Sequence, residues 1–87
     1  MRVQWTEESL DRAADLYITL DLAGQDEFAA AVARINARLA SDPWAVGESR
    51  STRNHRSWYS PPVTVLFEVF PDDEIVLIQH VAAKRPK

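Results

Sequence analysis

Apolar residues in the N-terminal half of the sequence first recur with the spacing of an amphipathic helix. Thr6 is a good N-cap residue, and Glu7 and Glu8 after it suit the first turn of a helix, where negative charge is favourable. The pattern predicts a first helix from Glu7 to about Asp21, with Gly24 as the residue that stops it. Its apolar stripe comprises Leu10, Ala13, Ala14, Tyr17 and Ile18.

A second helical stripe follows and begins at Asp26 and Glu27. Ser41-Asp42-Pro43 ends it, because proline disfavours the helical conformation in the residue before it. The connection between the two helices is short, which predicts an antiparallel helical hairpin. The second stripe comprises Phe28, Ala31, Val32, Ile35 and Leu39.

The C-terminal half has the alternating pattern of strands. Val63–Phe70 alternates apolar and polar residues, and Ile75–Val81 is almost continuously apolar, as expected of a central strand. Pro71-Asp72-Asp73 between them predicts a turn and therefore a hairpin. Val3–Trp5 reads as a short first strand, and the arginine-rich segment Ser49–Tyr59 as a polar strand that Pro61-Pro62 interrupts.

These elements predict an α+β fold in the order β-α-α-β-β-β within a single domain, residues 1–87. The N-terminal helical hairpin is expected to pack on one face of a small, mainly antiparallel sheet. The opposite face, carrying Arg50 to Arg56, is expected to remain uncovered.

Composition narrows the class of protein. The 87 residues include no cysteine, which excludes disulfides, thiolate metal sites and a cysteine nucleophile. The N-terminus lacks the apolar run of a signal peptide, and no uncharged apolar stretch is long enough to span a bilayer. We therefore expect a cytoplasmic protein that does not enter membranes.

Charge is distributed unevenly along the chain. Residues 1–48 hold four arginines against nine acidic residues, a net charge of −5, whereas residues 49–87 hold six basic against four acidic residues, a net charge of +2. A general nucleic-acid-binding surface requires more positive charge than this. A small local anion site in the C-terminal half is compatible with it.

Arg50, Arg53 and Arg56 are the candidates for such a site. On an extended strand, Arg50 and Arg56 share a face and Arg53 points the other way, so the first two could hold a phosphate or carboxylate. Three arginines on an edge strand also discourage edge-to-edge association, and they could pair with the acidic helices.

His55 and His80 are candidate general acid or base groups, because the pKa of an unperturbed histidine lies near neutrality. A hydrogen-bonded structural histidine is equally compatible with the apolar strand around His80. Tyr59, with Trp58, could stack on a base or on a side chain of a protein partner, or Trp58 could pack on the proline turn. The sequence has no metal-ligand spacing, no Gly-rich phosphate loop and no Gly-x-Ser-x-Gly motif, so we expect no metal and no cofactor.

Several segments, in this order, resemble the RelE/ParE superfamily of toxins from type II toxin–antitoxin systems. A tryptophan-tipped first strand precedes two helices, the second of which ends in Leu39-Ala40-Ser41-Asp42-Pro43. Gly47-Glu48-Ser49-Arg50 follows, then Val65-Leu66-Phe67-Glu68-Val69 and Val76-Leu77-Ile78-Gln79-His80-Val81. The resemblance covers nearly the whole chain and depends on apolar spacing and order.

The resemblance implies a compact toxin that binds a cognate antitoxin protein. It also implies a role in plasmid stabilization, with which toxins of this superfamily are associated. RelE-like members cleave mRNA on the ribosome, and ParE-like members act on DNA gyrase. For a ribonuclease, Arg50, Arg56, His80 and Arg85 are the expected site, and the basic tail with Lys84 suits the functional C-terminal end of the family. The alternative is that this basic C-terminal tail is solvated and has no role in a site.

Two features depart from the ribonucleases of this family. Those ribonucleases usually place a basic residue at the start of the strand where this chain has Thr64. They are also strongly basic overall, whereas this chain carries a net charge of −3. Three hypotheses follow: a toxin-family protein that binds an antitoxin, a ribosome-dependent endoribonuclease, and a non-toxic interaction module that retains only the fold.

Overall fold

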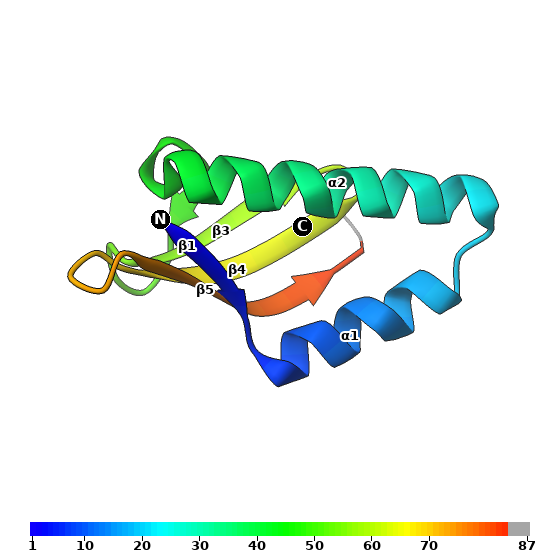
Figure 1. The fold of residues 1–87 in the computed structure, drawn as a ribbon, viewed down its shortest axis with the longest axis horizontal. Helices are drawn as coiled ribbons and strands as arrows, with labels where there is room; N and C mark the ends of the chain where they lie inside the picture. The colour runs from blue at the N-terminus through cyan, green and yellow to red at the C-terminus, as the bar shows by residue number, and fades with distance from the viewer. Residues whose placement is uncertain (84–87) are drawn as a thin grey trace.

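A computed structural model describes residues 1–83 of the chain and has two helices ahead of most of the strands (Figure 1). The predicted α+β class and β-α-α-β-β-β order are confirmed, with one short strand and one short 3-10 helix added. In chain order the elements are β1 (Arg2–Trp5), α1 (Glu7–Ile18), α2 (Leu22–Ser41), the 3-10 helix η1 (Pro43–Ala45), β2 (Glu48–Ser49), β3 (His55–Ser60), β4 (Val63–Phe70) and β5 (Ile75–Ala82).

The five strands of the described residues form one sheet in the order β1-β5-β4-β3-β2. β1 runs parallel to β5, with Trp5 opposite Ile78, and the other neighbouring strands are antiparallel. The predicted hairpin of β4 and β5 is confirmed. β5 is an interior strand between β1 and β4, as predicted. Val76, Ile78 and Val81 of its apolar run are fully buried in the core, whereas Ile75 and Leu77 are half-buried on the opposite face.

The hydrophobic core lies between α2 and the sheet. Every second residue of β4 from Val63 to Val69 is fully buried, so the alternation in the sequence directly separates a core face from an outer face. The buried residues of α2 recur at helical spacing and face these strands. The core comprises Phe28, Ala31, Ile35, Leu39, Val46, Val63, Val65, Phe67, Val69, Val76, Ile78 and Val81.

α1 begins where β1 ends and is tied to β5. Thr6 is its N-cap, as predicted, and the side-chain oxygen of Thr6 accepts a hydrogen bond from the backbone N–H of Ser9 at 3.0 Å. The buried Ser9 hydroxyl donates to the carbonyl oxygen of Ile78 at 3.0 Å, and the Thr6 N–H donates to the same oxygen at 3.0 Å. These bonds satisfy polar groups where the chain turns from strand to helix.

The predicted boundary between the two helices is wrong. α1 ends at Ile18, and α2 already begins at Leu22, with Asp21 as its N-cap. The Asp21 carboxylate accepts a hydrogen bond from the N–H of Gly24 at 2.8 Å, so Gly24 lies in the first turn of α2 and does not stop α1. A capping aspartate three residues before a helical N–H accounts for the earlier start.

The prediction of one continuous strand over Ser49–Tyr59 is also wrong. The segment forms a hairpin of β2 and β3, in which Ser49 lies opposite Arg56 and the N–H of Arg50 donates to the carbonyl of His55 at 2.8 Å. The turn lies between them, and the Thr52 hydroxyl accepts a hydrogen bond from the His55 N–H at 3.3 Å. The break at Pro61-Pro62 is confirmed, because these residues form the turn between β3 and β4.

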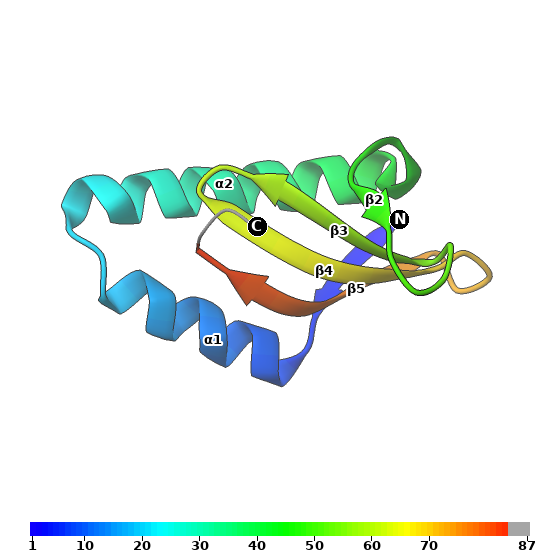
Figure 2. The same cartoon turned by 180° about the vertical axis from the view of Figure 1, so that it is seen from behind.

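α1 and α2 are joined at one end and diverge from it, as both views show (Figures 1 and 2). α2 lies across one face of the sheet, and α1 lies beside β5. Seen from the other side, β3, β4 and β5 have no helix in front of them (Figure 2). The expected uncovered sheet face is therefore present.

Candidate functional site

The sheet face that neither helix covers, called the open face here, carries side chains from β3, β4 and β5. His55 lies opposite Glu68, and Tyr59 lies opposite Thr64. These residues alternate along their strands with residues whose side chains face the helices, such as the fully buried Val65 and Phe67. The open face therefore combines titratable, aromatic and apolar groups.

A chain of hydrogen bonds crosses the open face. The His55 ring contacts the Thr52 hydroxyl through Nδ1 at 2.9 Å and Oε1 of Glu68 through Nε2 at 3.1 Å. The Gln79 amide donates to the same Glu68 oxygen at 3.1 Å. Both ring nitrogens of His55 are thus engaged, which fixes the ring and ties the β2–β3 turn to β4 and β5.

An irregularity in β5 brings two polar residues to this face. Leu66 pairs with His80, but Phe67 pairs with Ile78, so Gln79 is the additional residue of a β-bulge. A bulge breaks the alternation of side chains and re-aims them. As a result Gln79 reaches Glu68, while the exposed His80 stands opposite Leu66 on the same open face.

A small hollow of about 160 Å³ lies next to this network. Two of the predicted binding residues, Arg50 and His55, line this hollow, and Gln79 contributes an amide group. The exposed Arg50 guanidinium can bind an anionic oxygen there, whereas the His55 ring and the Gln79 amide already contact Glu68. The hollow is lined by Arg50, Ser51, His55, Arg56, Leu66, Phe67 and Gln79.

Arg56 does not share a face with Arg50 as predicted for a single strand. It lies opposite Phe67, which faces the helices, and its guanidinium reaches over the segment before β2. Nε and Nη2 donate to the Val46 carbonyl at 3.2 and 3.1 Å, Nη2 donates to the Gly47 carbonyl at 3.1 Å, and Nη1 donates to the Ser49 hydroxyl at 3.0 Å. These contacts give Arg56 a structural role in holding β2 against β3.

Arg53 lies in the β2–β3 turn and is exposed. Its guanidinium carbon stands 5.1 Å from the centroid of the Trp44 ring, and that of Arg56 stands 6.0 Å from the same ring. Such stacking of an arginine on an aromatic face is favourable by about 0.5–1 kcal/mol at exposed sites. The predicted separation of Arg53 from Arg50 arises from the turn, not from alternation along a strand.

The remaining predicted site residues are spread more widely. Tyr59 is half-buried on the open face and also lines a second hollow with Arg34 and Pro62. Lys84 and Arg85 lie outside the described residues. The structure thus brings Arg50 and His55 together and places His80 on their face, while Arg56 borders the same hollow with its guanidinium bonded to residues 46–49.

Thr52, Glu68 and Gln79 were not predicted as site residues. A detectable signal existed for Glu68: if Pro61-Pro62 is a tight turn, antiparallel pairing counted back from Ser60 opposite Val63 places His55 opposite Glu68. For the bulge that brings in Gln79, the signal is the pair of adjacent polar residues Gln79 and His80, which interrupts the apolar run of this strand and does not fit a regular alternation.

Residues 1–83 contain no group of three or more histidine, aspartate or glutamate side chains that could hold a metal ion. In the same part of the chain, no helix has both the length and the apolar character needed to cross a bilayer.

Comparison with known proteins gives no match by sequence, to either a protein-family model or a curated protein. Comparison of structures gives clear matches. The isolated RelE toxin of E. coli superposes with a TM-score of 0.65 at 10% identity, covering 98% of this chain and 85% of that chain. A chain of the intact E. coli RelBE toxin–antitoxin complex gives a TM-score of 0.64 at 11% identity, covering 98% and 96%.

This chain has the RelE fold. The expected α+β architecture is therefore confirmed as RelE-like over nearly the whole chain, although about nine in ten aligned residues differ. Within this fold, the start of β4 carries Thr64 and the open face carries the Arg50, His55, Glu68 and His80 side chains.

Proposed function

We propose that this protein is the toxin-family component of a type II toxin–antitoxin system. The observation that carries the proposal is the match to the E. coli RelE toxin over 98% of the chain. A fold is shared by proteins of different function, so the proposal also depends on surfaces that could bind a partner. The open face, with its hollow at Arg50 and His55, is one such surface.

The proposed partner is a cognate antitoxin protein. A chain in the E. coli RelBE toxin–antitoxin complex has this fold, which supports such a partner. The proposed target is the translation machinery or DNA gyrase, and both place the site of action in the cytoplasm. The acidic net charge of −3 favours a protein target over extended contact with nucleic acid.

Expression tests this proposal directly. We expect the chain expressed alone to arrest growth, and co-expression with the small open reading frame adjacent to its gene to restore growth and yield a complex. A reconstituted translation reaction and a gyrase supercoiling reaction with the purified protein then separate the two targets. Normal growth together with no complex would overturn the proposal and favour a non-toxic interaction module.

A ribosome-dependent endoribonuclease is the second candidate. It is favoured by the presence of Arg50, His55 and His80 on one face of the sheet. In such a reaction, one group takes the proton of the RNA 2′-hydroxyl, another protonates the leaving 5′-oxygen, and an arginine stabilises the charge on the phosphate. His80 and Arg50 suit the last two roles. Arg56 would first have to leave its carbonyl partners, and Arg85 remains a sequence-based candidate.

Cleavage of mRNA on purified ribosomes tests this candidate. We expect His80→Ala to lower the cleavage rate by about a hundredfold, the usual contribution of a general acid or base. Arg50→Ala should lower it as well, whereas Arg12→Ala on the exposed side of α1 should leave it unchanged. Cleavage that survives the double change at Arg50 and His80 excludes the open face as the catalytic site.

A further inference from the structure

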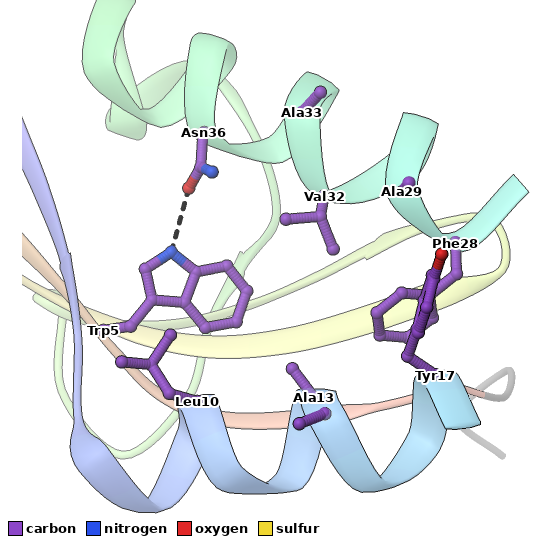
Figure 3. A pocket seen from close by; sticks show the side chains of 10 residues that line it. Trp5, Leu10, Ala13, Tyr17, Phe28, Ala29, Val32, Ala33 and Asn36 are labelled. Carbon is purple, nitrogen blue, oxygen red and sulfur yellow. Dashed lines mark hydrogen bonds between the residues drawn. The ribbon is translucent and has the colours of Figure 1, made fainter. Parts of the chain in front are cut away.

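An apolar groove of about 610 Å³ lies between α1 and α2, on the side of the molecule away from the open face (Figure 3). Leu10, Ala13 and Tyr17 project from α1 toward α2, Phe28 and Val32 come from α2, and the Trp5 ring lies between the helices. The groove exists because the helices diverge and leave their facing stripes only partly in contact.

The exposed apolar surface of the described residues concentrates around this groove. Leu10 and Tyr17, which line the groove, are 54% and 40% exposed. Ile18 and Leu22, at the end where the helices join, are 73% and 81% exposed. Large apolar side chains gathered at one place on a small protein indicate an interaction surface.

The lining of the groove is mainly apolar and offers few hydrogen bonds to an occupant. Its polar side-chain groups are the Trp5 indole, the Asn36 amide and the Tyr17 hydroxyl, and the indole is already engaged, because Nε1 of Trp5 donates to Oδ1 of Asn36 at 3.0 Å. The walls are helices, whose backbone groups are bonded internally. An extended peptide would therefore leave its own N–H and C=O groups unpaired, whereas a helix brings its backbone already satisfied.

The net charge of α1 and α2 indicates which residues should flank the apolar stripe of a helix bound in the groove. Residues 7–41, which include both helices, hold seven acidic residues and three arginines, a net charge of −4. One of the three, Arg34, is directed away from the groove, since it donates to the Ser60 hydroxyl at 2.8 Å and to the Pro61 carbonyl at 2.9 Å. A second copy of this chain would bring the same negative charge, so self-association is disfavoured.

We propose that this groove binds an amphipathic helix whose apolar stripe is flanked by lysine and arginine. The apolar side chains at positions i, i+3, i+4 and i+7 of that helix fill the groove, and its basic flanks face the acidic surface of α1 and α2. The inference rests on the proposed function only in assigning the helix to the antitoxin.

A synthetic peptide tests the groove without knowledge of the natural partner. The probe is a fluorescent peptide of about 18 residues, five turns of helix, with leucines in one stripe and lysines elsewhere. One control peptide has the same composition in scrambled order, and a second has glutamate in place of lysine. Fluorescence anisotropy with the full chain measures each dissociation constant.

Two arginine substitutions on α2 give a matched pair. Ala33 lines the groove, whereas Ala37 lies one turn further along the helix and does not line it, and both are exposed. Ala33→Arg should weaken binding of the lysine peptide by about tenfold, equivalent to about 1.4 kcal/mol, and Ala37→Arg should have little effect. Because the change in charge is the same, the difference isolates the groove.

A second variant removes apolar surface without adding charge. Leu10→Ser should weaken binding several-fold, and folding should be preserved because Leu10 is more than half exposed. Equal binding of the scrambled peptide, equal effects of Ala33→Arg and Ala37→Arg, or a dimer of the chain that Ala33→Arg dissociates would each overturn the proposal.

The same variants separate this proposal from the proposed function. Peptide binding in the groove without growth arrest or an antitoxin complex supports the groove and contradicts the toxin assignment. An antitoxin complex that remains as tight with Ala33→Arg as with Ala37→Arg supports the toxin assignment and contradicts the groove as its docking site.

Discussion

Arginines of the same segment have different roles because their guanidinium groups contact different atoms. Arg50 is exposed and lines the hollow on the open face. Arg56 donates four hydrogen bonds to residues 46–49 and lies over the Trp44 ring. Neither residue type nor spacing distinguishes these two roles. The distinction depends on which strand face packs against the helices, and that is decided by the whole sheet.

Arg56→Ala should lower the free energy of unfolding by about 1–3 kcal/mol. The reason is that the Val46 and Gly47 carbonyl groups would lose the charged donor from which they now accept hydrogen bonds. Arg50→Ala should change it by less than about 0.5 kcal/mol, since Arg50 is exposed. Urea unfolding followed by tryptophan fluorescence measures both. Equal stability of the two variants would contradict the structural role of Arg56.

This comparison also guides the interpretation of functional assays. A loss of activity in Arg56→Ala has to be separated from loss of folded protein, whereas a loss in Arg50→Ala does not. For this reason the open-face variants proposed above change exposed residues, Arg50 and His80.

The interiors of the helices and of the two long strands followed directly from periodicity, but the ends of elements did not. The stripe at Phe28, Ala31, Ile35 and Leu39 is buried as its spacing predicted. The start of α2 depends on one local hydrogen bond at Asp21, which competes with the acidic pair at Asp26 and Glu27 as a helix start. Periodicity is weak at helix ends, because the first turn is held by caps and not by burial.

The N-cap at Asp21 can be tested by mutation. Asp21→Ala should destabilise the protein by about 1 kcal/mol, because the N–H of Gly24 loses its partner. Asp21→Asn should retain most of the stability, since asparagine caps nearly as well. Asp26→Ala, inside α2, serves as the matched control and should be close to neutral. Circular dichroism during thermal unfolding measures the stability of all three variants. A larger loss of stability for Asp26→Ala than for Asp21→Ala would instead support the predicted helix start at Asp26.

The β2–β3 hairpin shows a second limit of the sequence pattern. Residues 49–59 carry too few apolar side chains for alternation to reveal a change of direction. The turn is specified instead by the Thr52 hydroxyl, which contacts both the N–H and the ring of His55. Such side-chain-to-backbone bonds favour turns over strands, yet threonine is also common in strands, so its presence alone decides nothing.

At the scale of the whole molecule, the fold class was predictable and the shape of the binding surfaces was not. Two amphipathic helices and an apolar sheet must bury their stripes against each other, which leaves few arrangements. The divergence of α1 from α2 depends on where α1 meets β5, through Ser9 and Ile78, and no sequence period encodes that contact. The apolar groove between the helices therefore became visible only in the structure.

One core joins α2 to β4 and β5, so we expect the described residues to unfold as one cooperative unit. Ile35 is fully buried in this core. Ile35→Val should lower the free energy of unfolding by about 1 kcal/mol through the loss of one buried methyl group, whereas Leu22→Ala at an 81% exposed position should cost less than about 0.5 kcal/mol.

Two probes report on different parts of the molecule. Far-ultraviolet circular dichroism follows mainly the helices, and tryptophan fluorescence follows Trp5, Trp44 and Trp58 in β1, η1 and β3. If the core couples these parts, Ile35→Val shifts both urea transitions by the same amount and leaves their slopes unchanged. A shift confined to the helical signal would mean that α2 separates from the sheet before the sheet unfolds, and the groove between α1 and α2 would then belong to an independently opening part of the molecule.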